Sequence, residues 1–342
     1  MSDPLSAGEC QSMLLRRRPD GAPSRQDFEL VTQAIPTPGP GEVVTRTLFL
    51  SIDPYMRGRL REEQTYAVAI QIGEVMTGET VGEVIASNHP GFVAGDLVVG
   101  ARGWQTHSLS KGEHLVKIAR NAAPLSAYLG VLGMPGATAY AGISEICEPK
   151  KGETVVISAA SGAVGSVAGQ LAKRAGARVV GIAGGPDKCL FVQESLGFDA
   201  CVDHRTHSFE ADLKSECPDG IDAYFENVGG AVQAAVFGLL NPFARVAMCG
   251  MVSQYNERVF PPGPNLGFVV GKRVKIQGFI VSDRPERLIE WRQLAAPWVA
   301  SGELAYREDV HEGLENAPRA LAGILTGQNF GKLLVKVGAD PM

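Results

Sequence analysis

Hydrophobic residues follow one pattern in the first third of the chain and another in the part that follows. Up to about residue 126, short strand-like runs alternate with glycine and proline turns, as at residues 43–51, 79–86 and 96–100. Such spacing is typical of a β-rich, barrel-like domain. Further on, strand-like and helix-like segments alternate, which predicts a doubly wound α/β domain with a parallel sheet. Its strands are expected near residues 154–159, 178–183, 200–203, 222–226, 244–250 and 274–281.

The last part of the sequence returns to the first pattern. A helix-like segment at residues 317–325 leads to a strand-like segment at 333–337, so this tail could close the first domain. Two domains also fit a length of 342 residues with 45% hydrophobic content. The predicted boundaries are 1–126 together with 302–342 for the barrel-like domain, and 127–301 for the doubly wound domain.

Residues 154–184 carry the most informative pattern. Residues 154–159 are a β-branched apolar run of the length expected for a buried parallel strand. Gly162 and Gly165 then open a helix, and Gly176 closes it. The apolar residues of this helix recur at the spacing of one face packed on a sheet: Val164, Val167, Ala168, Leu171, Ala172 and Ala175.

A glycine turn before a helix suits a pyrophosphate, because the first amides of a helix have no partner within it and its dipole favours an anion. Ala160 stands at the first glycine of the usual GxGxxG fingerprint, with Gly162 and Gly165 as the second and third. Within its strand, helix and second strand, this degenerate fingerprint predicts a dinucleotide site. A plain βαβ unit or a nucleoside site of another chemistry stays open, although a methyltransferase would want an acid at the second strand's tip.

The second strand, residues 178–183, ends without the Asp or Glu that binds the ribose 2′-hydroxyl in NAD enzymes. Gly184 follows, and Lys188 lies in the first turn of a helix predicted at 186–196. A cation at this place favours a 2′-phosphate, so the sequence predicts NADP(H). Each charge-assisted contact is worth about 1.5–3 kcal/mol. The alternative for Lys188 is a solvated helix lysine.

Composition narrows the class of protein and its partners. A net charge of −5 with interspersed signs gives no reason to expect nucleic acid. The six scattered cysteines contain no CxxC pair, which indicates neither a disulfide framework nor structural zinc and favours a reducing compartment. No apolar run approaches the ~20 residues of a membrane span. We therefore expect an untargeted cytoplasmic protein without a membrane partner.

Six motifs follow one another along the chain: SIDPYMRGR (51–59), GMPGATAY (133–140), AASGAVGSVAGQLAK (159–173), FENVGG (225–230), CGMVSQYN (249–256) and NFGKLLVKV (329–337). In this order they resemble the prostaglandin reductase, leukotriene B4 12-hydroxydehydrogenase and curcumin reductase branch of the zinc-independent medium-chain dehydrogenases/reductases. The resemblance covers the chain from about residue 43. It implies a catalytic GroES-like barrel domain, an NADP-binding Rossmann domain, and NADPH-dependent reduction of carbon–carbon double bonds conjugated to carbonyls.

The resemblance also bears on metal chemistry. Zinc alcohol dehydrogenases of this superfamily carry a cysteine ligand near the end of the strand at 48–51 and a GHE motif before Gly82. This chain reads SIDP and TGETVG there, so Gly78 stands at the histidine's place and no metal is expected. Hydride addition to an enone needs only a hydrogen-bond donor for the enolate and a proton source.

The resemblance implies a role for two tyrosines. Tyr255 of SQYN is expected beside the nicotinamide and the substrate, as the phenol that stabilises or protonates the enolate, and Tyr55 of DPYM is the second candidate. Either could instead be an aromatic residue packed at the domain seam.

The resemblance implies the cofactor contacts as well. Residues expected at the cofactor are Gly162, Ala163, Val164 and Gly165 at the pyrophosphate, Gly184, Lys188 and His204 around the 2′-phosphate, and Asn227, Tyr255 and Asn329 on the nicotinamide and ribose side. The family often has tyrosine near the 2′-phosphate, whereas this chain reads DHR (203–205). His204 or Arg205 is expected to take that contact, unless both face solvent, and Asn227 could be a turn asparagine.

The sequence leaves other functions open. An NADPH:quinone reductase is the alternative enzyme, and a nucleotide-binding protein without catalysis is the alternative from another class. Residues 274–281 are a candidate edge strand that pairs across a two-fold axis in a homodimer. His107 and His114 are expected to be turn and surface residues rather than a ligand pair, and Arg57 and Arg59 to brace a turn rather than bind an anion.

Overall fold

The computed structural model describes residues 8–62, 68–120 and 122–339. The chain divides into two compact units. Met1–Leu129, Asp309–Asn329 and Leu333–Met342 make up the first unit, and Gly130–Glu308 with Phe330–Lys332 make up the second. The domain boundaries after residues 126 and 301 stay a prediction.

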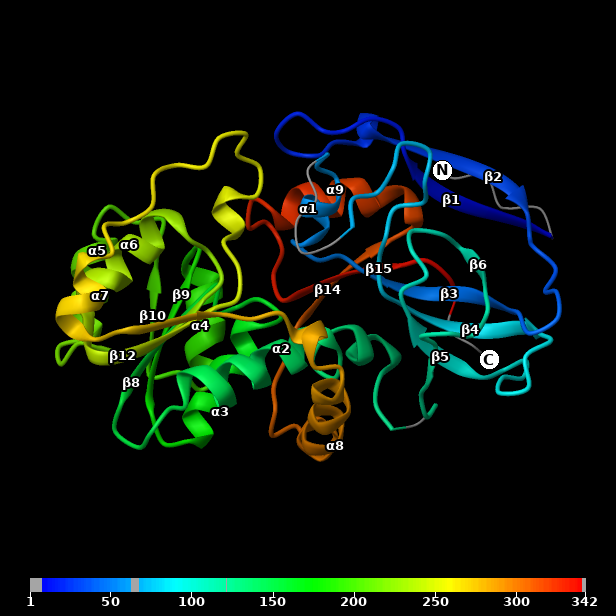
Figure 1. Cartoon of the computed structure of the whole chain (residues 1–342). Coiled ribbons are helices and arrows are strands. Elements are labelled where there is room, and N and C mark those ends of the chain that lie inside the picture. Colours follow the sequence, from blue (N-terminus) through cyan, green and yellow to red (C-terminus); the bar gives the residue numbers. More distant parts are fainter. Residues whose placement is uncertain (1–7, 63–67, 121, 340–342) are drawn as a thin grey trace. The chain divides into compact units, whose positions relative to one another are not determined.

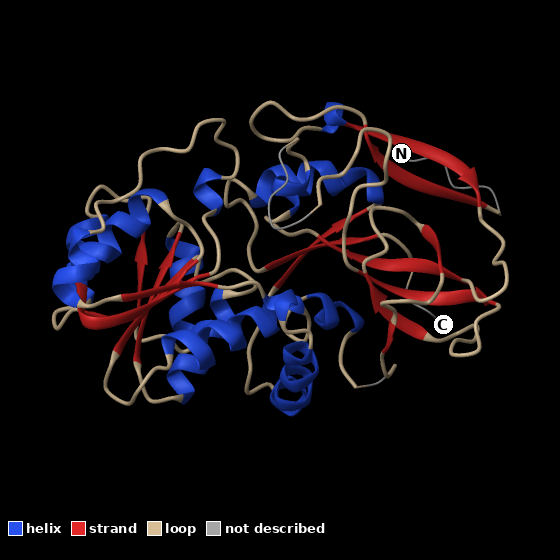
Figure 2. Ribbon diagram, viewed as in Figure 1, coloured by secondary structure: helices blue, strands red, loops and turns tan. Residues whose placement is uncertain are grey.

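The first unit is built on β-strands. A hairpin of β1 (Glu9–Leu15) and β2 (Phe28–Ala34) accompanies a seven-stranded sheet with the order β14-β15-β3-β4-β5-β7, in which β6 also pairs with β3 (Figure 2). The strands of this sheet are β3 (Val43–Ser51), β4 (Thr80–Ser87), β5 (Leu97–Gly100), β6 (His107–Ser110), β7 (Val116–Lys117), β14 (Glu308–Glu312) and β15 (Lys332–Lys336). The α-helices among the described residues of this unit are α1 (Met56–Arg59) and α9 (Ala317–Ile324). This unit is the β-rich, GroES-like domain that the sequence predicts.

The second unit is a doubly wound parallel sheet with helices on both faces (Figure 1). Its strand order is β10-β9-β8-β11-β12-β13, and the pairs along this order are parallel. The strands are β8 (Thr154–Ser158), β9 (Arg178–Ala183), β10 (Ala200–Asp203), β11 (Ile221–Glu226), β12 (Leu240–Met248) and β13 (Lys275–Gly278). The helices are α2 (Met134–Gly142), α3 (Gly165–Arg174), α4 (Pro186–Glu194), α5 (Phe209–Glu216), α6 (Gly230–Leu239), α7 (Gly267–Lys272) and α8 (Glu286–Ser301). The Rossmann prediction is confirmed.

The strand order places a switch point between β8 and β11, because the chain winds outward in one direction from β8 and in the other from β11. In open α/β sheets, ligands bind at the carboxyl ends of the strands at such a point. The sheet beneath it is firmly packed, since the five residues of β8 are all buried and α5, α6 and α7 share a hydrophobic core with the strands. A rigid edge therefore carries the turns that follow β8, β9, β10 and β11.

One predicted strand is shorter than expected. The apolar run at residues 274–281 forms a strand only over Lys275–Gly278, and a 3₁₀ turn, Val281–Asp283, follows. β13 is one of the two edge strands of the sheet, and an edge position is what the sequence predicts for it.

Candidate functional site at the carboxyl edge of the parallel sheet

The glycine turn brings the start of α3 against the end of β8. A Cβ atom on Gly165 would lie 2.3 Å from the carbonyl oxygen of Ala159, which a real side chain could not tolerate. Ala159 has a positive φ of 50°, and its carbonyl accepts the amide of Gly162 at 2.9 Å. Glycine is therefore required at 165 for the close approach of helix and strand, as in dinucleotide-binding turns.

Gly162, Ala163 and Val164 form the partly exposed rim of this turn. They stand before the ten-residue helix α3, whose N-terminus carries a partial positive charge and amides without intrahelical partners. No acidic residue lies in the first turn of α3. The rim thus fits the pyrophosphate of a dinucleotide.

Basic side chains gather at the next turn, after β9. A Cβ atom on Gly184 would lie 2.8 Å from Arg205 Nε and 2.9 Å from His204 Nε2, so both side chains lie against this glycine. Partial removal of the imidazole from water, followed by the positive charge of Arg205 and a smaller contribution from Lys188, lowers the pKa of His204. Three groups of the predicted 2′-phosphate site are therefore neighbours, and they form a cationic cluster of Lys188, His204 and Arg205.

Asp203 is the carboxylate at the tip of β10, and it is turned to the backbone. Its Oδ1 accepts the amides of Gly185 and Arg205, both at 2.9 Å. Burial works to raise the pKa of Asp203, but these amides and the charges of His204 and Arg205 hold it below its usual range. Asp203 thus holds together the turns that follow β9 and β10. Its carboxylate binds the backbone there and does not replace the acidic residue that is missing at the end of β9.

Asn227 lies at the switch point. Its side-chain amide donates to the carbonyl of Ser158 at 2.8 Å, and its backbone amide donates to the Ser158 hydroxyl at 2.8 Å. The carbonyl of Asn227 accepts the amide of Val252 at 3.1 Å, so the turn after β11 is joined to the segment after β12.

Tyr255 reaches this joined pair of segments. Its hydroxyl accepts the amide of Met251 at 3.3 Å. A Cβ atom on Gly250 would lie 3.0 Å from that hydroxyl and 3.6 Å from the carbonyl of Asn227, so only the small Gly250 separates the two groups. The structure thus brings Asn227 and Tyr255 together within the second unit.

The other two site candidates, Tyr55 and Asn329, belong to the first unit. Tyr55 precedes α1 and is half-buried, with the guanidinium of Arg59 5.8 Å from its ring centroid. Asn329 is half-buried just before β15. Their roles stay predictions.

Three contributors to this edge were not singled out by the sequence: Ser158, Glu226 and Gly250. Ser158 and Glu226 end neighbouring strands and are fully buried, and the Ser158 hydroxyl donates to Glu226 Oε1 at 3.1 Å. The letters of FENVGG contain the signal for Glu226, because a charged residue at the end of an apolar strand needs partners.

Two histidines and two arginines of the first unit were not expected to bind a ligand. His114 is exposed in a turn, as predicted. The prediction of a turn or surface position is wrong for His107, which lies half-buried at the start of strand β6. Arg57 Nε and Nη2 donate to the carbonyl of Gly21 at 3.1 and 2.9 Å, and Arg59 Nη1 donates to that of Val68 at 3.1 Å. These arginines brace turns, as predicted.

The described residues contain neither a grouped set of metal ligands nor a helix that could cross a membrane. Among them, no three side chains of His, Cys, Asp or Glu are grouped as metal ligands. In the same part of the chain, no helix combines the length and hydropathy that crossing a bilayer requires. All six cysteines are free thiols.

A parallel sheet in this order, with a glycine turn at its switch point and a cationic cluster at the neighbouring turn, defines a dinucleotide-binding protein of the Rossmann class. Two family models match the chain: an N-terminal domain of oxidoreductase over residues 11–118, and a zinc-binding dehydrogenase over residues 163–301.

Individual relatives match over nearly the whole chain. An NADPH-dependent curcumin reductase of Escherichia coli is 47% identical over 96% of both chains, and a 2-alkenal reductase (NADP(+)-dependent) of Nicotiana tabacum is 42% identical over 96% of this chain and 98% of its own. The crystal structure of CurA from Vibrio vulnificus in complex with NADPH superposes with a TM-score of 0.92 at 46% identity, covering 96% of this chain and 100% of that one. The chain belongs to the curcumin reductase and prostaglandin reductase branch of the medium-chain dehydrogenase/reductase family.

Proposed function

We propose that the protein reduces the carbon–carbon double bond of α,β-unsaturated ketones and aldehydes with NADPH. The observation that carries this proposal is the carboxyl edge of the sheet, where the glycine turn, the cationic cluster and the pair Asn227 and Tyr255 occupy successive turns. The similarity to curcumin and 2-alkenal reductases along the whole chain supports the same reaction class.

The residues of the second unit divide the cofactor among them. Gly162, Ala163, Val164 and Gly165 would hold the pyrophosphate at the start of α3. Beside Gly184, Lys188 and Arg205 would supply positive charge to the 2′-phosphate, and His204 would add a hydrogen bond that becomes charge-assisted as the pH falls. Asn227 and Tyr255 would meet the nicotinamide and its ribose.

The bound cofactor supplies a hydride to the β-carbon of the enone. The protein's part is to hold the carbonyl in place and to stabilise the negative charge that develops on its oxygen. Tyr255 is the phenol proposed for this task, because a neutral phenol donates a strong hydrogen bond and carries a transferable proton. Tyr55 is the second candidate for the same role.

NADPH oxidation against a panel of enals, cyclic and long-chain enones and quinones tests the function, with wild type and Tyr255→Phe side by side. We expect turnover of enals and enones, and a loss of about 10²–10⁴-fold in kcat for Tyr255→Phe at saturating NADPH, the range that a positioned proton donor contributes.

Each other outcome has a defined meaning. Unchanged turnover of Tyr255→Phe would remove that residue from the chemistry and leave Tyr55→Phe as the next variant. Turnover of quinones alone would make the protein a quinone reductase, and NADPH binding without any turnover would make it a nucleotide-binding protein.

The assembly that we propose is a homodimer joined through the exposed edge of β13, because an open strand edge pairs readily with a second copy. The proposed location is the cytoplasm, a reducing compartment in which six free thiols persist.

A further inference from the structure

Glu226 is a buried carboxylate without an assigned task. It is the last residue of β11, and its exposed fraction is 0%. Its Oε1 accepts the backbone amides of Val228 at 2.6 Å and Gly229 at 3.1 Å, besides the Ser158 hydroxyl. Burial of a carboxylate is costly unless hydrogen bonds compensate for it, so this arrangement needs an explanation.

These contacts put the carboxylate at the N-terminus of α6. Gly229 is the residue before that helix and Gly230 is its first residue, with φ of 77° and 59°. Such a terminus attracts an anion, as the start of α3 does. Before α6, the amides of Val228 and Gly229 are taken by the chain's own Glu226, so this second glycine turn serves to fix the backbone rather than to receive a phosphate.

Glu226 also joins three segments at the switch point. Through the Ser158 hydroxyl at the end of β8, its carboxylate is connected to the backbone amide of Asn227, the residue after β11. Its own carbonyl accepts the amides of Cys249 at 2.9 Å and Gly250 at 3.1 Å, at the start of the segment that leads to Tyr255. One residue therefore holds the backbone on which both Asn227 and Tyr255 stand.

A second buried group accompanies the carboxylate. Tyr224 lies two residues earlier on β11, so its side chain points to the same face of the sheet. Tyr224 Oη and Glu226 Oε2 are both buried, and neither has a hydrogen-bond partner within the described residues. Burial, and then the charge of Glu226, raise the pKa of Tyr224 well above its usual range, so the phenol remains a donor beside the carboxylate.

We propose that Glu226 is a positioning residue, whose buried carboxylate fixes the turn from Asn227 to Gly230 in the arrangement that receives the nicotinamide half of NADPH. The proposal rests on the proposed function, in which Asn227 and Tyr255 meet that half. Glu226 itself touches no ligand. Its effect is therefore confined to the nicotinamide side, and the adenosine side, at Gly184 and the cationic cluster, is independent of it.

Glu226→Gln tests this assignment, because it keeps the shape of the side chain and removes its charge. We expect the dissociation constant of NADPH to rise on the order of tenfold, since charge-assisted hydrogen bonds to the turn are weakened. The dissociation constant of adenosine 2′,5′-bisphosphate, which carries only the adenosine half, is expected to stay within about twofold of wild type. Both are measured by calorimetry, beside kcat and KM for an enone.

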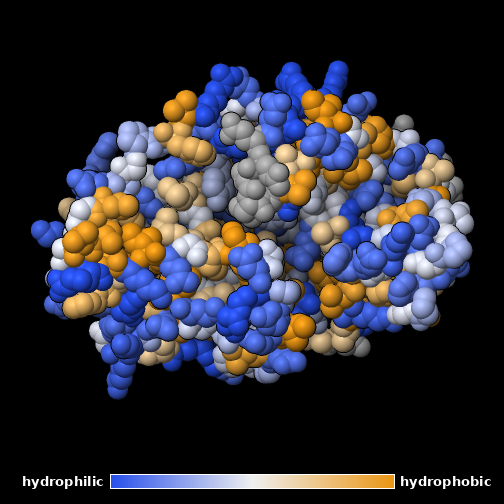
Figure 3. All heavy atoms as spheres, in the orientation of Figure 1, coloured by the Kyte–Doolittle hydropathy of each residue, from blue (hydrophilic) through white to orange (hydrophobic). Residues whose placement is uncertain are grey.

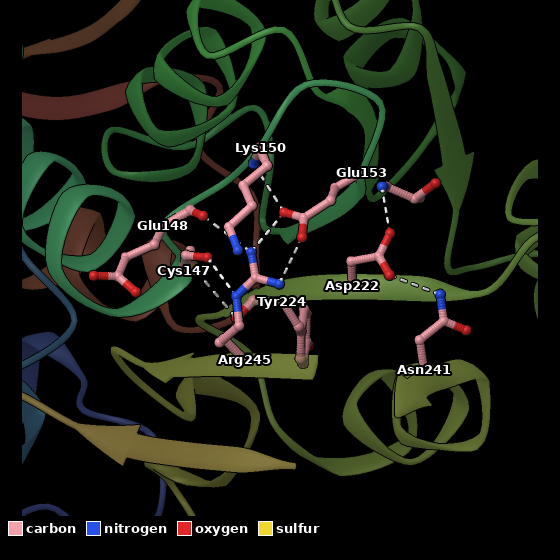
Figure 4. Close-up of polar contacts among 9 residues, drawn as sticks. Cys147, Glu148, Lys150, Glu153, Asp222, Tyr224, Asn241 and Arg245 are labelled. Atoms are coloured by element: carbon pink, nitrogen blue, oxygen red, sulfur yellow. Dashed lines mark hydrogen bonds and ion pairs between the residues drawn. The ribbon is translucent and has the colours of Figure 1, made fainter. Parts of the chain in front are cut away.

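Asp222→Asn is the matched control. Asp222 lies near the other end of the same strand and is also a carboxylate that accepts a backbone amide, that of Thr154 at 2.9 Å, besides the side chain of Asn241 at 2.8 Å (Figure 4). We expect this variant to lower the unfolding temperature while both dissociation constants stay as in wild type. If Glu226→Gln leaves NADPH binding unchanged, or weakens both ligands equally, the assignment is wrong.

If Glu226→Gln does not fold, Ser158→Ala tests the positioning role of Glu226 instead. It removes only the hydroxyl between Glu226 and Asn227, and the same selective loss of NADPH affinity is expected, about threefold. The proposal would be overturned if Ser158→Ala bound both NADPH and adenosine 2′,5′-bisphosphate as tightly as wild type does. Since these readouts are binding constants, they stand even if wild type turns over no enone, a result that would instead contradict the proposed function.

Discussion

His204 shows how one titrating side chain can set the strength of a phosphate site. Its pKa is lowered in the free protein by partial desolvation and by its cationic neighbours, so the imidazole is largely neutral at pH 7. A bound 2′-phosphate would favour the charged form. Affinity gained from His204 therefore appears as the pH falls through its pKa and disappears as the pH rises.

His204→Asn tests this dependence. We expect the NADPH affinities of wild type and variant to be similar at about pH 8, and wild type to bind up to about tenfold more tightly near about pH 5.5, the gain of one charge-assisted contact. Calorimetric titrations across this pH range measure the difference in NADPH affinity between wild type and variant. The titration of the phosphate itself affects both proteins equally and therefore cancels. NADH, which lacks the 2′-phosphate, is the control ligand. A gap that stays constant with pH would contradict the assignment.

Individual residues could be predicted from the sequence where a short motif by itself requires a particular residue type. Gly165 is such a case, because its close contact with Ala159 is what the fingerprint requires. Glu226 is the opposite case. Its partner Ser158 is 68 residues away in the chain, so the meaning of a buried acid in FENVGG depends on two strands becoming neighbours. Likewise, nothing local indicates the positive φ of Ala159.

At the scale of elements, Arg245 on β12 fastens the segments that precede β8. Its Nε donates to the carbonyl of Cys147 at 2.9 Å, and its two terminal nitrogens meet Glu153 at 2.9 and 2.6 Å (Figure 4). A further bond reaches the carbonyl of Glu148, which ends the π-helical turn Ile143–Cys147 with a φ of 41°. This ion pair thus stabilises a left-handed backbone that a glutamate rarely adopts.

Glu153→Gln is expected to cost about 1–3 kcal/mol of unfolding free energy at neutral pH, because it breaks a partly buried bidentate pair. Burial works to raise the pKa of Glu153, but Arg245 and the amide of Lys150 hold it below its usual range. Its contribution is therefore present above the unfolded-state pKa of about 4.3 and is lost as the pH falls through the lower folded-state pKa.

Urea unfolding at several pH values measures that difference. The gap between wild type and Glu153→Gln should be constant above about pH 5.5 and close below about pH 4. Glu216→Gln is the control, since its pair with Arg178 is about 40% exposed on both sides and is worth about 0–1 kcal/mol. If both variants lost the same unfolding free energy, the pair of Arg245 with Glu153 would stabilise the protein no more than the exposed pair of Arg178 with Glu216.

The elements themselves follow the sequence closely where local signals agree. β3, β9 and β10 begin and end at the predicted residues. β12 begins four residues earlier than the pattern indicates, because Asn241 and Pro242 look like a turn. They lie at a register shift, between the pairs of Leu240 with Ile221 and of Arg245 with Ala223. The hairpin of β1 and β2 was not assigned, since its strands mix polar and apolar residues and depend on long-range partners such as the carbonyl of Trp104.

For the whole molecule, the surface beside β13 is the expected contact between copies. Apolar atoms gather over the region of α7 (Figure 3), and Val270 of that helix is 80% exposed. α7 leads directly into the edge strand. An open edge with apolar residues beside it is the kind of surface that a two-fold interface covers.

Val270→Asp is expected to shift the protein from the mass of two chains to that of one in size-exclusion chromatography with light scattering, because a carboxylate would be buried at the contact. Val93→Asp is the control, since Val93 is a 63% exposed valine of the first unit and its replacement should leave the mass unchanged. A wild type that elutes with the mass of one chain at every concentration would refute the dimer.

The path of the chain through the first unit has a consequence for its biosynthesis. β3 is one of the earliest strands to leave the ribosome, yet Leu334 and Val335 of β15 are its partners at Ser51 and Leu50. The intervening polypeptide includes the entire parallel sheet of the second unit. Residues 43–46 of β3 can pair with β6 much earlier, but residues 49–51 lack their partner strand for nearly the full length of synthesis. Nascent chains stalled before residue 330 are therefore the ones that chaperones should capture.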